Sequence, residues 1–362
     1  MKKKILIGLA ALAVIAVCLY CFVHIWDPAT CTEPETCKIC GTVRGEALGH
    51  SFTQPTCTEP AVCTVCGAEG DPALGHEWLS AAQGYRVCLV CGAEEGEKYD
   101  YASEINCNHV ILYNVGADYV VYSAGADERC YPASTTKLVT ACLALKYLEP
   151  EEVITVGNEV LLVGANSSTA GLMLGYRITV EDLIKALLIP SGNDAAYVLA
   201  YNTAVKASGK ELDRSGYIEY FVQMMNDFAR DAGALDTHFE NPDGYDAADH
   251  YTTAEDMLKL TMKALEFPLI KEVCAQTRVT ETLASGQTVT WSNSNKLLSS
   301  SRDAYYQYAT GLKTGSTPAA GNCLIATAEK DGETYVAVIM GCVSDDDRYT
   351  VANKLFASVF GE

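Results

Sequence analysis

A serine and a lysine three residues apart constrain most strongly how this chain can fold. Ser134 and Lys137 begin a mostly apolar run that extends to Leu145, directly after the turn-like residues 131–133. Positions i and i+3 of a helix share one face, so the hydroxyl and the amine point into the same space. Burial and the helix N-terminus both disfavour an ammonium ion, which lets a neutral amine take the serine proton near pH 7. The pair therefore predicts a buried helix that carries a nucleophile and its base.

Two further motifs bear on this interpretation, because the spacing alone also fits a helix cap beside a surface lysine. Ser191-Gly192-Asn193 follows an apolar run that ends at Pro190, and Lys313-Thr314-Gly315 stands just before a strand-like segment. In this order, SxxK, SxN and KTG form the signature of penicillin-binding proteins and serine β-lactamases. The three ordered motifs favour catalysis over a plain cap.

The residues around the motifs narrow the resemblance to one family. Five segments are similar to serine D-alanyl-D-alanine carboxypeptidases, the low-molecular-mass penicillin-binding proteins of peptidase family S11: 131–138, 188–196, 239–244, 250–256 and 311–317. The resemblance spans roughly residues 105–362. It implies a β-lactamase/transpeptidase-like α/β (α+β) fold, with an antiparallel sheet flanked by helices and a helical lobe. The implied activity is penicillin-sensitive removal of the terminal D-alanine from peptidoglycan stem peptides ending in D-Ala-D-Ala, without a cofactor.

The catalytic roles follow from the chemistry of the first two motifs. Ser134 is expected to attack the carbonyl of the penultimate D-Ala, and water then hydrolyses the acyl-enzyme. Lys137 is the expected acylation base, although the base is disputed in this superfamily. Ser191 relays a proton to the leaving amine, and Asn193 binds the peptide amide. The alternative for the second motif is a simple turn and helix cap.

The third motif is expected to bind substrate. Lys313 attracts the terminal carboxylate, Thr314 and Thr317 donate hydrogen bonds, and Gly315 lets the strand lie close to the substrate. The resemblance places the backbone amides of Ser134 and Ser316 in the oxyanion hole. Arg348 is a weaker candidate for binding the carboxylate and is expected mainly to form a structural ion pair. His250 precedes a helix start and is expected to be structural rather than a base.

Periodicity and caps predict the elements of this part of the chain. Residues 106–122 resemble a hairpin, residues 322–328 and 334–342 adjacent strands, and residues 349–360 a closing helix. Further helices are expected to start at Ser134, Thr179, Asn193, about Asp213, and Thr253. Of six cysteines here, Cys323 and Cys342 could face each other, and the rest are interpreted as small core residues: Cys107, Cys130, Cys142 and Cys274.

Residues 28–104 contain an internal repeat with a displacement of 26 positions. Its members are Cys31, Cys37, Cys40 and His50 in the first copy and Cys57, Cys63, Cys66 and His76 in the second. A third copy keeps only Cys88 and Cys91 and is interpreted as a degenerate cap. Three thiols and one imidazole in each copy resemble a Cys3His zinc-ribbon-like module.

Other arrangements of these cysteines remain open. A disulfide framework fits an even number of cysteines outside the membrane but leaves two histidines without a purpose. Thiol redox chemistry is a further alternative. We expect zinc within each copy, although Cys37, Cys40, His50 and Cys57 form an equally well-spaced set. Few aliphatic residues are available, so some cross-linking is needed for this segment to fold.

The N-terminus predicts attachment to a bacterial cell membrane. Residues 2–4 are lysines, and the apolar stretch 5–26 is long enough to cross a bilayer. We expect residues 1–27 to form a single uncleaved span with the catalytic domain outside, or alternatively a cleaved signal of a secreted protein. Relatives often carry a C-terminal anchor after a β-rich domain, and this chain ends just after the closing helix. The net charge of −20 argues against a nucleic-acid partner.

Other activities are compatible with the same nucleophile. A β-lactamase of class A needs a glutamate in an ExxLN pattern, which Glu240-Asn241 does not fit. β-Lactams are therefore expected to act as inhibitors. A DD-endopeptidase cannot be separated from a carboxypeptidase by these residues. A non-catalytic wall-binding protein is a further alternative.

Overall fold

The computed structural model describes residues 24–82, 85–96 and 105–361, which divide into two units. The N-terminal unit comprises residues 24–79 and 86–95, and the C-terminal unit contains the three motifs. The two units are described separately.

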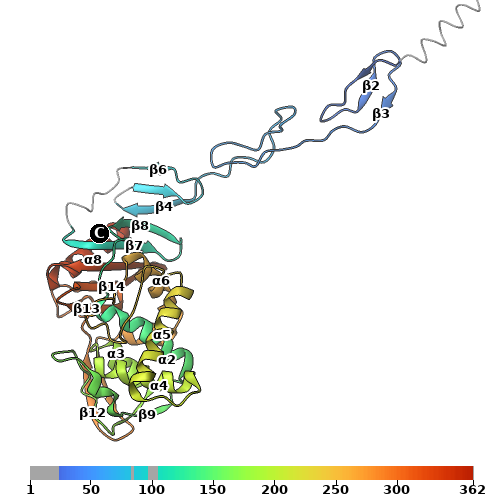
Figure 1. Cartoon of the computed structure of the whole chain (residues 1–362). Coiled ribbons are helices and arrows are strands. Elements are labelled where there is room, and N and C mark those ends of the chain that lie inside the picture. The colour runs from blue at the N-terminus through green and yellow to red at the C-terminus, as the bar shows by residue number, and fades with distance from the viewer. Residues whose placement is uncertain (1–23, 83–84, 97–104, 362) are drawn as a thin grey trace, which may run out of the picture. The chain divides into compact units, whose positions relative to one another are not determined.

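A five-stranded antiparallel sheet forms the centre of the C-terminal unit (Figure 1). Strands β14 and β15 are almost continuously buried, as expected of strands whose two faces are both covered. The predicted hairpin is confirmed as β7 and β8, which join the far side of β15. In spatial order, the strands are β13 (Ala309–Thr317), β14 (Gly321–Lys330), β15 (Glu333–Cys342), β7 (Cys107–Asn114) and β8 (Tyr119–Ala124).

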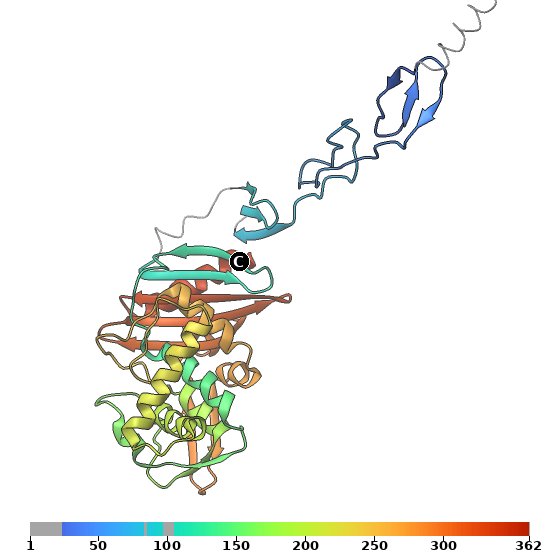
Figure 2. The ribbon, with the colours of Figure 1, turned by 45° about the vertical axis from the view of Figure 1, so that its right-hand side comes forward.

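Helices cover this sheet and form a lobe beside β13 (Figure 2). Helix α8 (Asp345–Phe360) packs on β14 and β15 around one apolar core, and a larger core lies among the lobe helices. The remaining helices are α2 (Lys137–Tyr147), α3 (Val180–Leu188), α4 (Asn193–Ser208), α5 (Arg214–Asp231), α6 (Ala254–Ala264) and α7 (Pro268–Cys274). Short elements complete the unit: β9 (Val153–Thr155), β10 (Arg177–Thr179), β11 (Arg278–Thr282), β12 (Thr288–Ser292), and the 3-10 helices η2 (Ala133–Thr136), η3 (Asn158–Leu162) and η4 (Lys296–Leu298).

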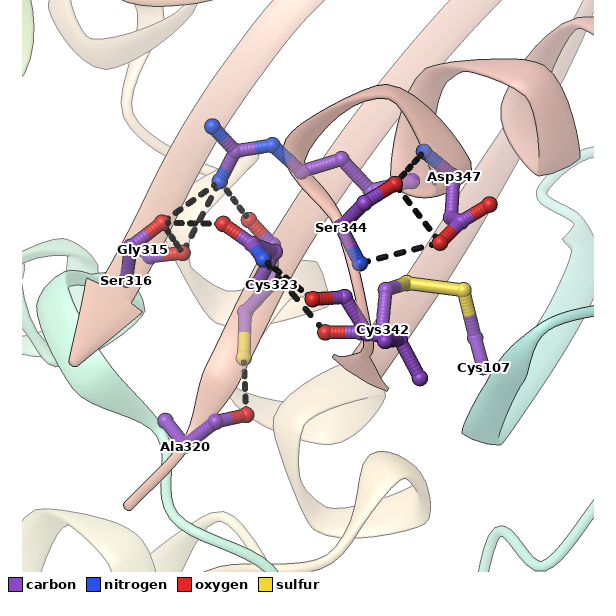
Figure 3. Close-up of a disulfide and its surroundings, with 11 residues drawn as sticks. Cys107, Gly315, Ser316, Ala320, Cys323, Cys342, Ser344 and Asp347 are labelled. Carbon is purple, nitrogen blue, oxygen red and sulfur yellow. Dashed lines mark hydrogen bonds between the residues drawn. A yellow bond between two sulfur atoms is a disulfide. The ribbon is translucent and has the colours of Figure 1, made fainter. Parts of the chain in front are cut away.

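Side-chain caps begin several of these helices where the sequence predicts them. The hydroxyls of Thr179 and Thr253 accept backbone N–H bonds at 3.1 Å, and Asp213 caps α5. The closing helix begins at Asp345 rather than at Tyr349. A reciprocal capping box between Ser344 and Asp347 starts it (Figure 3).

One disulfide joins two neighbouring strands of the sheet, β7 and β15. Cys107 opens β7 and lies opposite Cys342 at the end of β15, and their Sγ atoms are bonded (Figure 3). The suggested pairing of Cys323 with Cys342 is wrong. A register shift between β14 and β15 at this point leaves Cys323 buried against the carbonyl of Ala320.

We expect the double variant Cys107→Ala/Cys342→Ala to unfold at a lower temperature. The bond spans a sequence separation of 235 residues. Losing such a cross-link costs about 2–5 kcal/mol, which corresponds to a fall in Tm of ~10 °C. Calorimetry with and without dithiothreitol measures it. Reductant should lower the Tm of the wild type and leave the double variant unchanged; an equal response of both proteins would contradict the prediction.

The N-terminal unit consists of short strands linked by cysteine-containing turns. One sheet is formed by β1 (Trp26–Asp27), β2 (Glu35–Cys37) and β3 (Val43–Arg44), and another by β4 (Trp78–Ala82), β5 (Tyr85–Cys88) and β6 (Glu94–Glu95). Between them, isolated bridges join Phe52 to Cys63 and Val62 to Glu69. The backbone thus forms three small modules.

Two residues at the end of the apolar stretch 5–26, His24 and Trp26, belong to the first module. Most of the apolar stretch 5–26 lies outside the described residues. Trp26 belongs to β1, and Nδ1 of His24 lies 3.4 Å from Sγ of Cys37, so the first module includes His24. In the ranges that the structure covers, no helix has the length and apolar character needed to cross a bilayer.

Candidate active site and metal-ligand groups

Ser134 and Lys137 meet at the junction of η2 and α2. The 3-10 turn carries Ser134, and the α-helix starts at Lys137. Nζ of Lys137 donates a hydrogen bond of 2.8 Å to Oγ of Ser134. This is the geometry that a base needs to remove the serine proton.

Burial prepares Lys137 for that role. Its side chain is 0% exposed, and Nζ also donates to the backbone carbonyl of Asp243 at 2.5 Å. Burial lowers the pKa of Lys137 to about 8, although the nearby carboxylates of Asp243 and Asp194 oppose the shift. About a tenth of the amine is therefore neutral at pH 7 and free to accept a proton.

A tight backbone contact fixes the turn before the serine. Ala133 adopts a left-handed φ of 48°, and Gly244 adopts a φ of 82° against it. A Cβ atom on Gly244 would stand 1.8 Å from the carbonyl oxygen of Ala133. Only glycine allows the loop that carries Asp243 to come this close to the nucleophile.

Strand β13 brings the third motif to the same place. An added Cβ on Gly315 would lie 3.0 Å from the backbone nitrogen of Ser134. Arg348 fixes the position of β13. Its Nη1 donates hydrogen bonds to the backbone carbonyls of Gly315 at 2.9 Å and Cys323 at 3.0 Å, two residues labelled in Figure 3. The guanidinium also pairs with Asp345, which agrees with the structural role expected of Arg348.

We expect Gly315→Ala to slow acylation by about 10- to 100-fold while the protein stays folded. The new methyl group would push β13 away from Ser134 and so separate the backbone amides of Ser134 and Ser316, which are the expected oxyanion hole. Stopped-flow acylation by a chromogenic β-lactam measures the rate. Gly116→Ala is the matched control, since its Cβ would meet only Oδ1 of Asn114 at 3.7 Å. A normal rate in Gly315→Ala would contradict the role of this close approach.

The second motif is buried at the start of α4. Ser191 has a positive φ of 62° and is 7% exposed, and Asn193 is 5% exposed. In the described part of the chain, Oδ1 of Asn193 is buried without a hydrogen-bond partner. Asp194 anchors the segment, because its carboxylate accepts backbone N–H bonds from Ala170 and Leu172 at 2.8 and 2.9 Å. An unpartnered acceptor of this kind is available to a substrate amide.

Lys313 contributes a second buried amine. It is 0% exposed and donates to the carbonyl of Thr314 at 2.8 Å. Burial, and then the charge of Lys137, lowers its pKa well below the usual value. An incoming carboxylate would supply the missing negative charge and favour the ammonium form.

The hydroxyls of the third motif have partners within the protein. Thr314 Oγ1 lies 2.6 Å from Oγ of Ser294, and Ser316 Oγ donates to the carbonyl of Gly315 at 2.7 Å. Thr317 Oγ1 accepts from the amide of Ala320 at 3.0 Å. Across the described residues, no hydrogen bond connects Ser191 or Asn193 with this strand.

His250 is fixed as a neutral ring. Nδ1 accepts the backbone N–H of Glu240 at 3.1 Å, so the proton resides on Nε2, which donates to Thr136 Oγ1 at 3.0 Å. Burial lowers its pKa to about 3. The ring therefore connects the loop before it to η2, in line with its expected structural role.

Asp243, Asp194 and Ser294 had no assigned role in the sequence analysis. Asp243 and Asp194 lie in segments 239–244 and 188–196, which resemble the family, but the resemblance does not predict their hydrogen bonds. Ser294 lies outside all five segments. Its contact with Thr314 depends on tertiary structure alone.

The predicted metal ligands come together, but in different sets. Ligand atoms within 4.8 Å of one another form three groups: Cys31, His50, Cys63 and Cys66; Cys57, His76, Cys88 and Cys91; and His24, Cys37 and Cys40. The expected grouping within each copy is wrong, as is the alternative set. The backbone brings the CxxC turn of one copy to the histidine of the preceding copy, so Cys88 and Cys91 are ligand candidates rather than a degenerate cap.

Comparisons with known proteins identify the family of this chain. The family model described as D-alanyl-D-alanine carboxypeptidase, peptidase S11, matches residues 96–344. A D-alanyl-D-alanine carboxypeptidase from Streptomyces sp. (strain K15) is 32% identical over 253 residues, which are 67% of this chain and 83% of the relative. The carboxypeptidase DacC from Escherichia coli (strain K12) is 29% identical over 76% of this chain and 67% of its own length.

Solved structures of a DD-transpeptidase and of a penicillin-binding protein are also similar to this chain. The crystal structure of the Streptomyces K15 DD-transpeptidase matches with a TM-score of 0.66 and 30% identity, over 74% of this chain and 100% of that one. Penicillin-binding protein D2 from Listeria monocytogenes, in an ampicillin-bound form, matches with a TM-score of 0.58 and 27% identity over 71% of this chain and 98% of that one. The chain therefore belongs to the D-alanyl-D-alanine carboxypeptidases of peptidase family S11, which are serine hydrolases.

Proposed function

We propose that this protein is a serine DD-carboxypeptidase that removes the terminal D-alanine from peptidoglycan stem peptides, with Ser134 as nucleophile. The observation that carries this proposal is the 2.8 Å hydrogen bond from the buried Lys137 to Ser134. The pKa of about 8 for Lys137 allows the proton transfer at neutral pH. Penicillin-sensitive acylation of the same serine follows from this chemistry.

The reaction divides into two steps. Oγ of Ser134 bonds to the carbonyl carbon of the penultimate D-Ala while its proton passes to Nζ of Lys137. The amides of Ser134 and Ser316 stabilise the oxyanion. The C–N bond then breaks, and the leaving amine takes a proton through Ser191. Water hydrolyses the ester and regenerates Ser134.

The charge of the site favours a substrate with a free carboxylate. Lys137 and Lys313 are both fully buried, and the charge of Lys137 disfavours the ammonium form of Lys313. A terminal carboxylate beside Lys313 offsets that repulsion, with Thr314 and Thr317 as neighbouring donors. Asn193 then binds the substrate's peptide amide. An internal peptide bond without a free carboxylate lacks this contribution.

A matched pair of substrates tests the proposal. We expect the terminal peptide bond of a tripeptide ending in D-Ala-D-Ala to be cleaved at least about 100-fold faster than the same bond in the peptide with an amidated C-terminus. Lys313→Ala should reduce kcat/KM for the acid and narrow the preference for it over the amide. Lys271→Ala, a lysine of α7, is the control variant. Equal hydrolysis of both peptides would overturn the carboxylate requirement and favour an endopeptidase.

Transfer of the acyl group is a second candidate activity. The Streptomyces K15 relative is named a carboxypeptidase in one comparison and a DD-transpeptidase in another. Both reactions share the acyl-enzyme and differ in whether water or an amine attacks it. Adding glycylglycine to the peptide assay and analysing products by mass spectrometry separates hydrolysis from transfer.

We further propose that the enzyme acts outside a bacterial cell membrane, held there by residues 5–23. The Cys107–Cys342 disulfide supports an oxidising compartment, and the apolar residues after three lysines support an anchor. Protease treatment of intact cells tests this arrangement. Digestion of the C-terminal unit from outside is expected, and full protection would contradict it.

We also propose that the metal-ligand groups of the N-terminal unit hold structural zinc. Mixed thiolate and imidazole donors in sets of four are the ligands that zinc prefers in structural sites. The unit has few aliphatic residues, so bound metal would contribute most of its folding free energy. Metal analysis of the purified protein tests this. A metal-free protein that keeps the same circular dichroism after EDTA would contradict it.

A further inference from the structure

We infer that each metal of the N-terminal unit joins two consecutive repeats rather than completing one of them. This inference rests on the zinc binding proposed above and adds which ligands share an ion. In each set of four, one copy supplies its first cysteine and its histidine. The next copy supplies both cysteines of its CxxC turn.

The first site shows how the backbone creates this arrangement. Within the first copy, Leu48 N donates to Thr30 O at 2.8 Å, and Gly49 N donates to Cys31 O at 3.1 Å. These bonds bring Cys31 beside His50. Across the boundary, the Sγ atoms of Cys31 and Cys63 lie 3.7 Å apart, and Cys66 Sγ lies 3.3 Å from His50 Nδ1.

The second site repeats the arrangement with the next pair of copies. Gly75 N donates to Cys57 O at 3.0 Å, which brings Cys57 beside His76. The Sγ atoms of Cys57 and Cys88 lie 3.8 Å apart, and Cys91 Sγ lies 3.4 Å from His76 Nδ1. The third copy therefore needs no first cysteine and no histidine, because its CxxC turn completes the site of the copy before it.

These spacings suit one shared ion. Sulfur atoms about 2.3 Å from a tetrahedral zinc lie about 3.8 Å from each other, and a sulfur and an imidazole nitrogen lie about 3.6 Å apart. The separations of 3.7 and 3.8 Å match the first value, and those of 3.3 and 3.4 Å are slightly below the second. A sulfur–sulfur bond of about 2 Å would need these thiols to move.

Backbone pairing also joins consecutive copies, independently of the thiol side chains. The aromatic residue two positions after each histidine pairs with the strand that carries the next CxxC turn, as in Trp26 with Cys37 and Phe52 with Cys63. The ring of His50 also stacks on Phe52, with centroids 5.3 Å apart. The folded module thus begins at a histidine and is offset from the repeat in the sequence.

His24, Cys37 and Cys40 form the corresponding group at the start of the unit. Nδ1 of His24 lies 3.4 Å from Cys37 Sγ and 3.3 Å from Cys40 Sγ. Three donors are present there among the residues that the structure covers, so this group should bind metal more weakly than the two complete sets. It is not needed for the inference.

Two double variants that each lack two cysteines distinguish sites shared between consecutive copies from sites within each copy. Cys31→Ser/Cys63→Ser removes two ligands from one inferred site, and Cys57→Ser/Cys63→Ser removes one ligand from each of two sites. Native mass spectrometry of the full chain in detergent, after zinc loading and removal of weakly bound metal, counts the ions. We expect the first variant to lose one zinc and the second to lose two.

Every outcome of this experiment is informative. Sites within each copy would give the reverse result, namely a loss of two ions in Cys31→Ser/Cys63→Ser and one in Cys57→Ser/Cys63→Ser. Equal losses would also overturn the inferred grouping. A wild-type chain without metal, lighter by the hydrogens lost in disulfide formation, would overturn zinc binding itself. Acylation by penicillin, which depends on the C-terminal unit, confirms that each variant preparation is folded and comparable.

Discussion

Replacing Ser134 by alanine is expected to abolish acylation, with a loss of at least about 10⁴-fold in peptide hydrolysis. The variant loses the atom that bonds to the carbonyl carbon, and the amine of Lys137 then has no proton to remove. Intact-mass spectrometry after incubation with benzylpenicillin measures the covalent adduct directly. The wild type should gain the mass of one penicillin, and Ser134→Ala should gain none.

The appropriate control is a serine in the same unit that has no part in the site. Ser301 is exposed and its Oγ lies 2.9 Å from Oγ of Ser299, so Ser301→Ala should acylate at the wild-type rate. An adduct that persists in Ser134→Ala would assign the nucleophile elsewhere. Wild-type protein that destroys penicillin without accumulating an adduct would instead indicate rapid deacylation, as in a β-lactamase.

Substitution of Lys137 by arginine is expected to reduce the acylation rate by about 10³-fold or more. Arginine keeps a positive charge of similar reach but does not lose its proton in proteins, so it cannot act as the base. Burial lowers the pKa of Lys137 to about 8. The neutral fraction of Lys137 grows as pH rises, so the wild-type acylation rate should increase up to about pH 8 and then level off.

Stopped-flow acylation across pH 5–10 measures this rising limb. Lys146→Arg, at the exposed end of the same helix, should keep both the rate and the profile of the wild type. Thermal unfolding of Lys137→Arg separates a chemical defect from misfolding, and Lys137→Met supplies a second variant without a base. Wild-type acylation by either Lys137 variant would contradict the assignment of Lys137 as base.

Much of the C-terminal unit follows from local sequence signals. The hydroxyls of Thr179 and Thr253 can satisfy free amides only at a helix start, and the alternating residues of β7 and β8 indicate a hairpin. Ser134 and Lys137 are close in sequence, so their contact depends on one turn of helix. Such features require no knowledge of the rest of the fold.

The contacts that the sequence did not predict depend on which distant segments become neighbours. Cys342 has five other cysteines in this unit as possible partners, and the sheet order alone brings Cys107 opposite to it. The carbonyl of Asp243 is a backbone group, so its side chain gives no sign that it accepts from Lys137.

The grouping of metal ligands shows a different limit. A repeat of constant length identifies equivalent residues in each copy, but a set that takes its CxxC pair from the next copy has the same composition as a set within one copy. Cys31 is therefore as compatible with Cys37 as with Cys63 on sequence grounds. Backbone pairing between copies, such as that of Phe52 with Cys63, determines which CxxC pair lies beside each histidine.

The disulfide at the start of β7 also determines where a mechanical load would enter the enzyme. Tension on the chain ahead of Cys107 would pull β7 away from β15 at its first residue, one hydrogen bond at a time. The covalent link to Cys342 transfers that tension to β15, close to the start of α8 at Asp345. Such a load would thus reach β15 and α8 without first separating β7 from the sheet.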